Sequence, residues 1–217
     1  MLSKLRHSFS GIVRGEGLRG LLVRFNERRR KYFRFFTCYI FVYDIDLSVP
    51  LPRARAPVEV RRLDPADRPA VEALARMYQE PATPEGVLRR LSDQEHCYVA
   101  YFEDRPVSYI WYAFRPWVRE YYNDTLKLAP DEIYVHDAYT VAELRGKNIY
   151  PLLKVYGAQD LARERGAKRV LMYVRIQNKA SLSASRRMGD KRAGRYVYLR
   201  LFGRHISLIF RHRPRPL

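Results

Sequence analysis

The second half of the chain changes from a strand pattern to a helix pattern across one short turn. Residues 131–141, DEIYVHDAYTV, mix β-branched and aromatic side chains as buried strands do. After the turn at 145–151, RGKNIYP, apolar residues recur at the i, i+3, i+4 and i+7 positions of an amphipathic helix. Gly166 stands where such a helix ends with a left-handed cap. The apolar helical positions are Ile149, Leu152, Leu153 and Tyr156.

Further runs of the same two kinds follow this segment and precede it. Downstream, residues 168–176, 196–202 and 205–210 predict strands, and residues 179–189 predict a short helix between the first two. Upstream, residues 58–63 predict a first strand. Strands and helices therefore alternate along most of the chain, which is typical of a mixed α/β domain.

Two helix-start signals follow the first strand. Asp64 is followed by Pro65, which predicts an N-cap and the first position of a helix that runs to about Tyr78. Thr83 and Pro84 repeat that signal and predict a second, short helix.

A hairpin and a long connection complete the middle of the chain. Residues 96–102 and 107–114 predict two strands joined by the turn at 103–106. Both faces of the second strand are largely apolar, so we expect it to lie centrally in the sheet. The aromatic and charged connection at 115–130 is long enough to serve as a lid over a neighbouring site.

The N-terminal part of the chain predicts a separate extension. Residues 17–36 fit a basic amphipathic helix, residues 37–47 a strand added to the edge of the main sheet, and residues 47–57 a proline-broken linker. We place the domain boundary near Pro57, with a short basic tail at the other end of the main domain. The apolar face of the helix, with Leu18, Leu21, Leu22 and Phe25, can pack on the domain or lie on an anionic membrane. In a third interpretation, the helix is an arm that binds an acidic protein or nucleic acid.

Charge is the unusual feature of the composition. The 41 Lys and Arg residues against 23 Asp and Glu residues give a net charge of +18. Residues 1–57 carry +8 of this and residues 58–217 carry +10, so the excess is spread along the chain. A partner or substrate that bears phosphates or carboxylates is favoured. Nucleic acid is not expected, because no known nucleic-acid-binding sequence pattern is present.

The cysteines and apolar runs bear on the cellular compartment. Cys38 and Cys97 lie in strand-like runs without metal-ligand spacing, which favours buried, reduced thiols. The longest continuous apolar run is far shorter than the ~20 residues that a spanning helix needs. We therefore expect a cytoplasmic protein, in peripheral contact with a membrane if the N-terminal helix binds lipid.

The turn at 145–151 has the features of a phosphate-binding turn. A strand, a glycine-containing basic turn and a helix together direct free backbone N–H groups and a positive helix-dipole end toward an anion. Arg145 and Lys147 add full positive charges there.

With this turn and the elements that follow it, the chain resembles the GNAT superfamily of acyl-CoA-dependent N-acyltransferases. That family binds the coenzyme A pyrophosphate on a turn that begins with Gln or Arg. A helix that begins with Asn, followed three residues later by Ala or Ser, comes about thirty residues after the turn and ends in Gly. The resemblance covers residues 58–204 and implies a GNAT-like, mostly antiparallel sheet of about seven strands flanked by helices. The matching residues are Arg145, Gly146 and Lys147 in the turn, and Asn178, Ser181 and Gly189 in the helix.

Four positions depart from the family pattern. Asn148 stands in place of a glycine, although asparagine tolerates the positive φ that the turn requires. Tyr150 stands in place of Gly or Ala, and its bulk would narrow the approach of a phosphate. Ser185 occupies the position of the family's general-acid tyrosine, and Asp190 replaces the usual aromatic residue.

The resemblance also assigns the chemistry. Acyl transfer from a thioester to an amine needs a base for the amine, an N–H donor for the oxyanion and an acid for the departing thiolate. We expect the base among Glu132, His136 and Asp137, with His136 preferred because histidine titrates near neutrality. Ser185 is the candidate acid, and no metal is expected. The expected contacts of acetyl-CoA, or of another acyl-CoA, are Tyr139, Thr140, Val141, Arg145, Gly146, Lys147, Asn148, Ile149, Tyr150, Asn178 and Ser181.

Three functions are consistent with these residues. The first is an N-acyltransferase, and foremost an N-acetyltransferase, that acts on a small amine, with acidic or phosphorylated amines favoured by charge. The second is a synthase that takes its acyl chain from acyl carrier protein. The third is a non-catalytic GNAT-fold module that binds an anionic membrane or another acidic partner.

Overall fold

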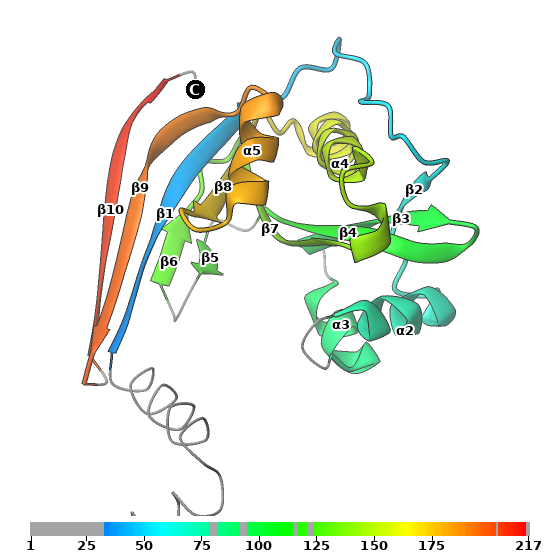
Figure 1. Cartoon of the computed structure of the whole chain (residues 1–217), viewed down its shortest axis with the longest axis horizontal. Coiled ribbons are helices and arrows are strands. Elements are labelled where there is room, and N and C mark those ends of the chain that lie inside the picture. Colours follow the sequence, from blue (N-terminus) through cyan, green and yellow to red (C-terminus); the bar gives the residue numbers. More distant parts are fainter. Residues whose placement is uncertain are drawn as a thin grey trace, which may run out of the picture. The chain divides into compact units, whose positions relative to one another are not determined.

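The fold is built on one eight-stranded mixed sheet. The computed structural model describes residues 33–78, 82–91, 95–114, 117–120, 124–202 and 204–215. The sheet has the strand order β10-β9-β1-β8-β7-β4-β3-β2, and β5 and β6 form a separate two-stranded sheet (Figure 1). The strands are β1 (Phe33–Asp44), β2 (Glu59–Arg62), β3 (Glu95–Phe102), β4 (Arg105–Ala113), β5 (Trp117–Glu120), β6 (Asp124–Lys127), β7 (Glu132–Thr140), β8 (Arg169–Arg175), β9 (Lys191–Leu201) and β10 (Arg204–Arg215). The helices are α2 (Arg68–Met77), α3 (Pro84–Arg90), the 3₁₀ turn η2 (Ala142–Leu144), α4 (Ile149–Arg165) and α5 (Lys179–Arg187).

The chain divides into two compact units. Unit 1 comprises Met1–Cys38 and Arg195–Phe210, and unit 2 comprises Tyr39–Gly194 and Arg211–Leu217. This division differs from the predicted boundary near Pro57, which stays a prediction. Residues 17–32 of the predicted basic helix lie outside the described residues.

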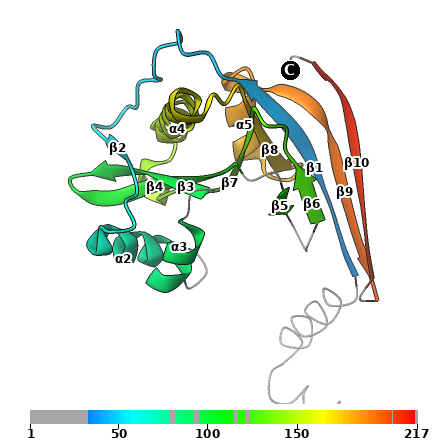
Figure 2. The ribbon, with the colours of Figure 1, turned by 180° about the vertical axis from the view of Figure 1, so that it is seen from behind.

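Helices cover both faces of the sheet in unit 2. Figures 1 and 2 show α4 on one face of β3, β4 and β7, with α2 and α3 on the opposite face. Side chains alternate along β4, so Ile110 and Tyr112 pack with the α4 side while Tyr109 and Trp111 pack with the α2 and α3 side. All four are at most 3% exposed, which confirms that this strand is central.

Local signals explain most of the element boundaries in unit 2. Thr83 caps α3 by accepting a hydrogen bond from the Gly86 N–H, as predicted. The predicted cap of the preceding helix is wrong by three residues. Asp64 accepts from the Ala66 N–H in a turn, and it is Asp67 that caps α2. An Asx turn and an N-cap use the same side-chain oxygen, so the sequence pattern fits both.

The position of β1 corrects two predictions. Residues 33–36 belong to this strand and not to a helix, and the strand lies between β9 and β8 rather than at the sheet edge. Its apolar residues are buried, including Ile40 and Phe41 at 1% exposure, as expected of an interior strand. This insertion accounts for eight strands where about seven were expected. Cys38 and Cys97 are buried thiols, as predicted.

The linker that follows β1 packs along α4. The Gln159 side-chain amide donates to the carbonyl oxygens of Asp46 at 3.1 Å and Val49 at 2.8 Å. Gln159 is therefore buried although its side chain is polar. The sheet covers one side of α4 and the linker another, so burial extends around the helix. The connection at 115–130 contains β5 and β6, and its role as a lid stays a prediction. No helix of the described residues is long and apolar enough to cross a bilayer.

A buried ion pair joins α4 to the segment between α5 and β9. Lys154 Nζ donates to Asp190 Oδ1 at 2.6 Å, and both side chains are 0% exposed. The same ammonium lies 4.8 Å from the ring centre of Tyr43. Burial lowers the pKa of Lys154 to about 8, although the Asp190 carboxylate opposes that shift. Among the described residues Asp190 Oδ2 has no hydrogen-bond partner, so the lysine is the main stabiliser of this carboxylate.

We expect Lys154→Ala to lower the free energy of unfolding by about 3–5 kcal/mol, because it leaves a buried carboxylate without its cation. Urea denaturation measures this change. Lys191→Ala is the matched control, since the Lys191–Asp44 pair spans 2.7 Å but is 46% and 54% exposed. That variant should lose less than about 1 kcal/mol. Equal losses in the two variants would contradict the stabilising role of the buried pair.

Candidate active site

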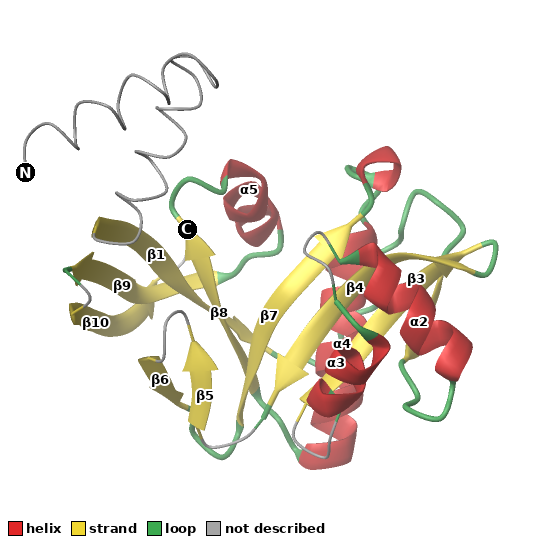
Figure 3. Cartoon of the chain, turned by 90° about the horizontal axis from the view of Figure 1, so that it is seen from below, coloured by secondary structure: helices red, strands yellow, loops and turns green. Residues whose placement is uncertain are grey.

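The strands β7 and β8 separate halfway along their length. Their parallel pairing joins residues 132–135 to residues 169–172. The strands themselves continue to Thr140 and Arg175, and they diverge in Figure 3. The second half of β7 is therefore paired with β4 on one side and is not paired with β8 on the other.

A β-bulge lies in β7 at the same place. Between the pairs Trp111–His136 and Tyr109–Tyr139, β4 advances by two residues and β7 by three. Two residues of β7 therefore oppose one of β4, which defines a bulge. Asp137 occupies it with a φ of 48°, in the left-handed region that aspartate tolerates better than most residues. The bulge redirects this part of the backbone and its side chains.

The bulge lies just before Tyr139, Thr140 and Val141, which were expected to contact acyl-CoA. Tyr139 and Thr140 have returned to the ladder opposite β4, and the Val141 N–H donates to the Val107 carbonyl at 2.9 Å. The Val141 N–H is therefore already used within the sheet. The interruption of the ladder falls at residues 137–138, where the sequence alone showed no sign of it.

The predicted phosphate-binding turn has the expected backbone. Gly146 has a φ of 76° and Asn148 a φ of 65°, and α4 begins directly afterwards. Asparagine thus takes the left-handed conformation that the departure from glycine had put in question. Lys147 is exposed and, within the described part of the chain, forms no ion pair. The Arg145 Nε donates to the Thr140 carbonyl at 3.1 Å, so this side chain folds back toward the end of β7.

The linker brings two further arginines to this turn. The Asn148 side-chain amide donates to the Arg53 carbonyl at 2.8 Å, and the Arg55 N–H donates to the Lys147 carbonyl at 2.7 Å. Both arginine side chains are exposed and form no ion pair among the described residues. This contact could not be predicted, because almost a hundred residues separate the linker from the turn.

The first residues of α4 face the core. Ile149 is 2% exposed, so its side chain belongs to the core rather than to the turn surface. Tyr150 is partly buried against the same cluster, and burial together with the Asp190 charge raises the pKa of its phenol.

The α5 residues have structural contacts. Asn178 Oδ1 accepts from the Ser181 N–H at 3.1 Å and caps the helix, as expected for this pair. Ser185 is 2% exposed, and its hydroxyl donates to the Met172 sulfur at 3.8 Å. The candidate acid thus lies packed between α5 and β8.

Arg90 forms the centre of a polar cluster on the α2 and α3 side of the bulge. Its Nη1 donates to Asp137 Oδ2 at 2.5 Å and to the Tyr78 hydroxyl at 3.0 Å. Its guanidinium lies 3.9 Å from the ring centre of Trp111. Burial raises the pKa of Tyr78 and that of Tyr109, so both phenols stay protonated at neutral pH.

Two of the candidate bases belong to this cluster and one does not. His136 Nδ1 lies 3.5 Å from Arg90 Nη2, and its Nε2 lies 4.0 Å from Glu95 Oε2. The side chain of Asp137 is 38% exposed and that of His136 is 21% exposed. Glu132 is instead held at the start of β7, where it accepts from the Ala129 N–H at 2.9 Å. Arg90 and Glu95 were not predicted, because only the tertiary fold brings them to β7.

Comparison with known proteins agrees with this geometry. The family model described as acetyltransferase (GNAT) family matches residues 60–189. A tandem GNAT protein from the clavulanic acid biosynthesis pathway superposes with a TM-score of 0.57 at 12% identity, over 81% of this chain and 54% of that one. A conserved protein of unknown function from Staphylococcus epidermidis gives 0.56 at 16% identity, over 82% and 66%. A GNAT-family protein from Novosphingobium aromaticivorans gives 0.51 at 16% identity, also over 82% and 66%. This chain thus spans about two thirds of those chains or less, and no curated protein sequence matches it.

We expect Gly146→Ala to destabilise the fold by about 1 kcal/mol, because an alanine at this φ is strained although its Cβ would meet no neighbouring atom. Thermal unfolding measures the loss. Gly86→Ala in α3 is the matched control, since its φ is not in the left-handed region and alanine is the better helix former. A stability loss in Gly86→Ala as large as that in Gly146→Ala would show that the backbone conformation is not the cause.

Proposed function

The chain belongs to the GNAT acetyltransferase family, and we propose that it moves an acyl group, foremost acetyl, from acyl-CoA to an amine. The observation that carries the proposal is the end of β7–β8 pairing after Val135 and Met172, next to a basic turn at the start of α4. An extended chain with a diphosphate at one end needs both features, an open path between strands and an anion site beside it.

The residues at the turn fit coenzyme A. The N–H groups that begin α4 and the left-handed backbone at Gly146 and Asn148 are suited to a pyrophosphate. Lys147 supplies a charge that no described carboxylate neutralises, and Arg53 and Arg55 add two more. When bound, acyl-CoA supplies the activated thioester. This chain would hold and orient the acyl-CoA and deprotonate the amine.

The polar cluster at the bulge is suited to receiving the amine. We propose that His136 accepts the amine proton, directly or through water, with Glu95 stabilising the imidazolium from the other side at 4.0 Å. Arg90 already binds Asp137, and this contact keeps the carboxylate at the bulge. Asp137 is partly exposed, so its carboxylate can contact a cationic acceptor. Arg90 and Glu95 are therefore positioning residues.

Calorimetry with coenzyme A tests the cofactor site. We expect Arg145→Ala/Lys147→Ala to weaken binding about tenfold or more, because charged hydrogen bonds to phosphate are lost. Arg53→Ala/Arg55→Ala should cost about threefold, an effect that shrinks at high salt. The matched control is Arg68→Ala/Arg76→Ala, which removes two exposed charges from α2. No heat and no thermal shift with the unaltered chain would overturn the proposal.

Turnover measured by free-thiol release tests the base. We expect His136→Gln to lower kcat about 10²-fold while coenzyme A affinity is kept, since general-base assistance contributes about that factor. Glu95→Gln should lower kcat less, because it acts through His136. An unchanged rate in His136→Gln would remove this residue from the mechanism. Comparison of acyl-CoA with acyl carrier protein as donor separates this function from the carrier-dependent alternative.

A further inference from the structure

The strands of unit 1 bury one face and leave the other open. On the buried face Phe36 stacks on Tyr198 with ring centres 4.9 Å apart and contacts Tyr196 at 5.9 Å. These three residues are at most 5% exposed. The Tyr196 hydroxyl also donates to Ser207 Oγ at 3.4 Å, which places Ser207 of β10 on the same face. These contacts fix which residues of β1, β9 and β10 point inward.

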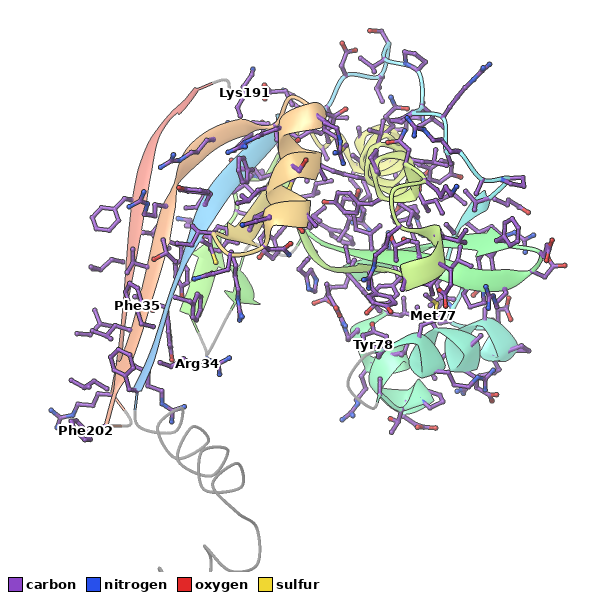
Figure 4. The ribbon with its side chains drawn as sticks, viewed as in Figure 1. Arg34, Phe35, Met77, Tyr78, Lys191 and Phe202 are labelled. Atoms are coloured by element: carbon purple, nitrogen blue, oxygen red, sulfur yellow. The ribbon has the colours of Figure 1, made fainter. Side chains whose placement is uncertain are left out.

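Strand alternation then places mostly apolar residues on the other face, which we call the outer face, together with Arg195 and Arg204. Figure 4 shows Arg34 and Phe35 on opposite sides of β1, in keeping with this alternation. The exposed fractions reach 57% at Phe35, 60% at Ile206 and 55% at Phe210. The apolar residues of the outer face are Phe33, Phe35, Val197, Leu199, Leu201, Ile206, Leu208 and Phe210.

An open apolar sheet face of this kind marks an interaction site. In a sheet with one solvated face, the residues that face water are normally polar. Here most of the residues that face water are apolar. Phe202, in the turn that joins β9 to β10, extends the apolar surface and is 77% exposed. Exposing so many large apolar side chains to water is unfavourable, so we expect a partner to cover them.

The charge of unit 1 identifies the chemistry of that partner. Unit 1 holds 13 basic and 2 acidic residues, a net charge of +11 in 54 residues. Unit 2 holds 28 basic and 21 acidic residues, a net charge of +7 in 163 residues. From residue 195 to the last residue the chain has six arginines and no aspartate or glutamate. Positive charge is therefore concentrated in the unit that carries the outer face.

This combination argues against a second copy of the chain as the occupant. Two outer faces in contact would bring Arg195 and Arg204 of both copies together, and the described residues of unit 1 include no aspartate or glutamate to compensate them. An anionic bilayer satisfies both properties, because its interface accepts apolar side chains while its head groups attract arginine. We propose that the outer face docks the chain on an anionic lipid membrane.

Sedimentation with lipid vesicles tests the proposal on the full chain. The probes are vesicles of phosphatidylcholine alone and vesicles that contain about a third phosphatidylserine. We expect binding to the anionic vesicles only, weakened by high salt because the charges are exposed. Phe35→Ser/Leu208→Ser/Phe210→Ser should weaken that binding about tenfold or more, since these side chains lose their apolar contact with the interface.

The matched control removes the same kind of surface from unit 2. Leu47, Val49 and Leu51 in the linker are 50%, 43% and 41% exposed, and their triple replacement by serine should leave vesicle binding unchanged. Arg195→Gln/Arg204→Gln, which removes the two basic side chains of the outer face, should reduce the preference for anionic over neutral vesicles. Coenzyme A calorimetry on each variant shows that unit 2 is intact, so this test does not depend on the proposed enzymatic function.

Three results would overturn the proposal. The first is equal binding of the unaltered chain to neutral and anionic vesicles, or none to either. The second is unchanged binding by the triple variant of the outer face. The third is a dimer in light scattering that this triple variant converts to a monomer, which would assign the outer face to a second copy.

Discussion

The site depends on a change in the bonding of one strand. In its first half β7 pairs with β8 and with β4, and in its second half it pairs with β4 alone. The bulge at Asp137 falls where this change occurs, so the strand bends and its partner β8 departs at the same level. The start of α4 and the cluster around Arg90 are both arranged around that point. If the two strands paired to their ends, β7 would have a partner on both sides along its whole length.

Features set by nearby residues could be predicted, and features set by distant contacts could not. Asn178, Thr83 and Gly166 were predicted as caps because a cap depends on the few residues beside it. The choice between Asp64 and Asp67 failed because both fit the same short pattern. The placement of β1 between β9 and β8, and of Arg90 against Asp137, follows from chain topology, which no local period records.

Residues outside the matched family segment complete the site. The family model begins at residue 60, yet the linker before it binds Asn148 and Lys147 at the turn and Gln159 along α4. Lys154 of the same helix lies under Tyr43 of β1 while it pairs with Asp190. The helix that begins at the proposed anion site is therefore held from three directions, by the sheet, by the linker and by the segment after α5.

The hydrogen bonds of the linker also determine how much chain the domain needs. A shortened protein that started at the first strand of the family segment would lack both carbonyl acceptors of the Gln159 amide. It would also uncover the outward side of α4, where burial now replaces the polar stripe of an ordinary surface helix. The segment that the family model matches is thus smaller than the unit that packs around α4, which also includes β1 and the proline-rich linker.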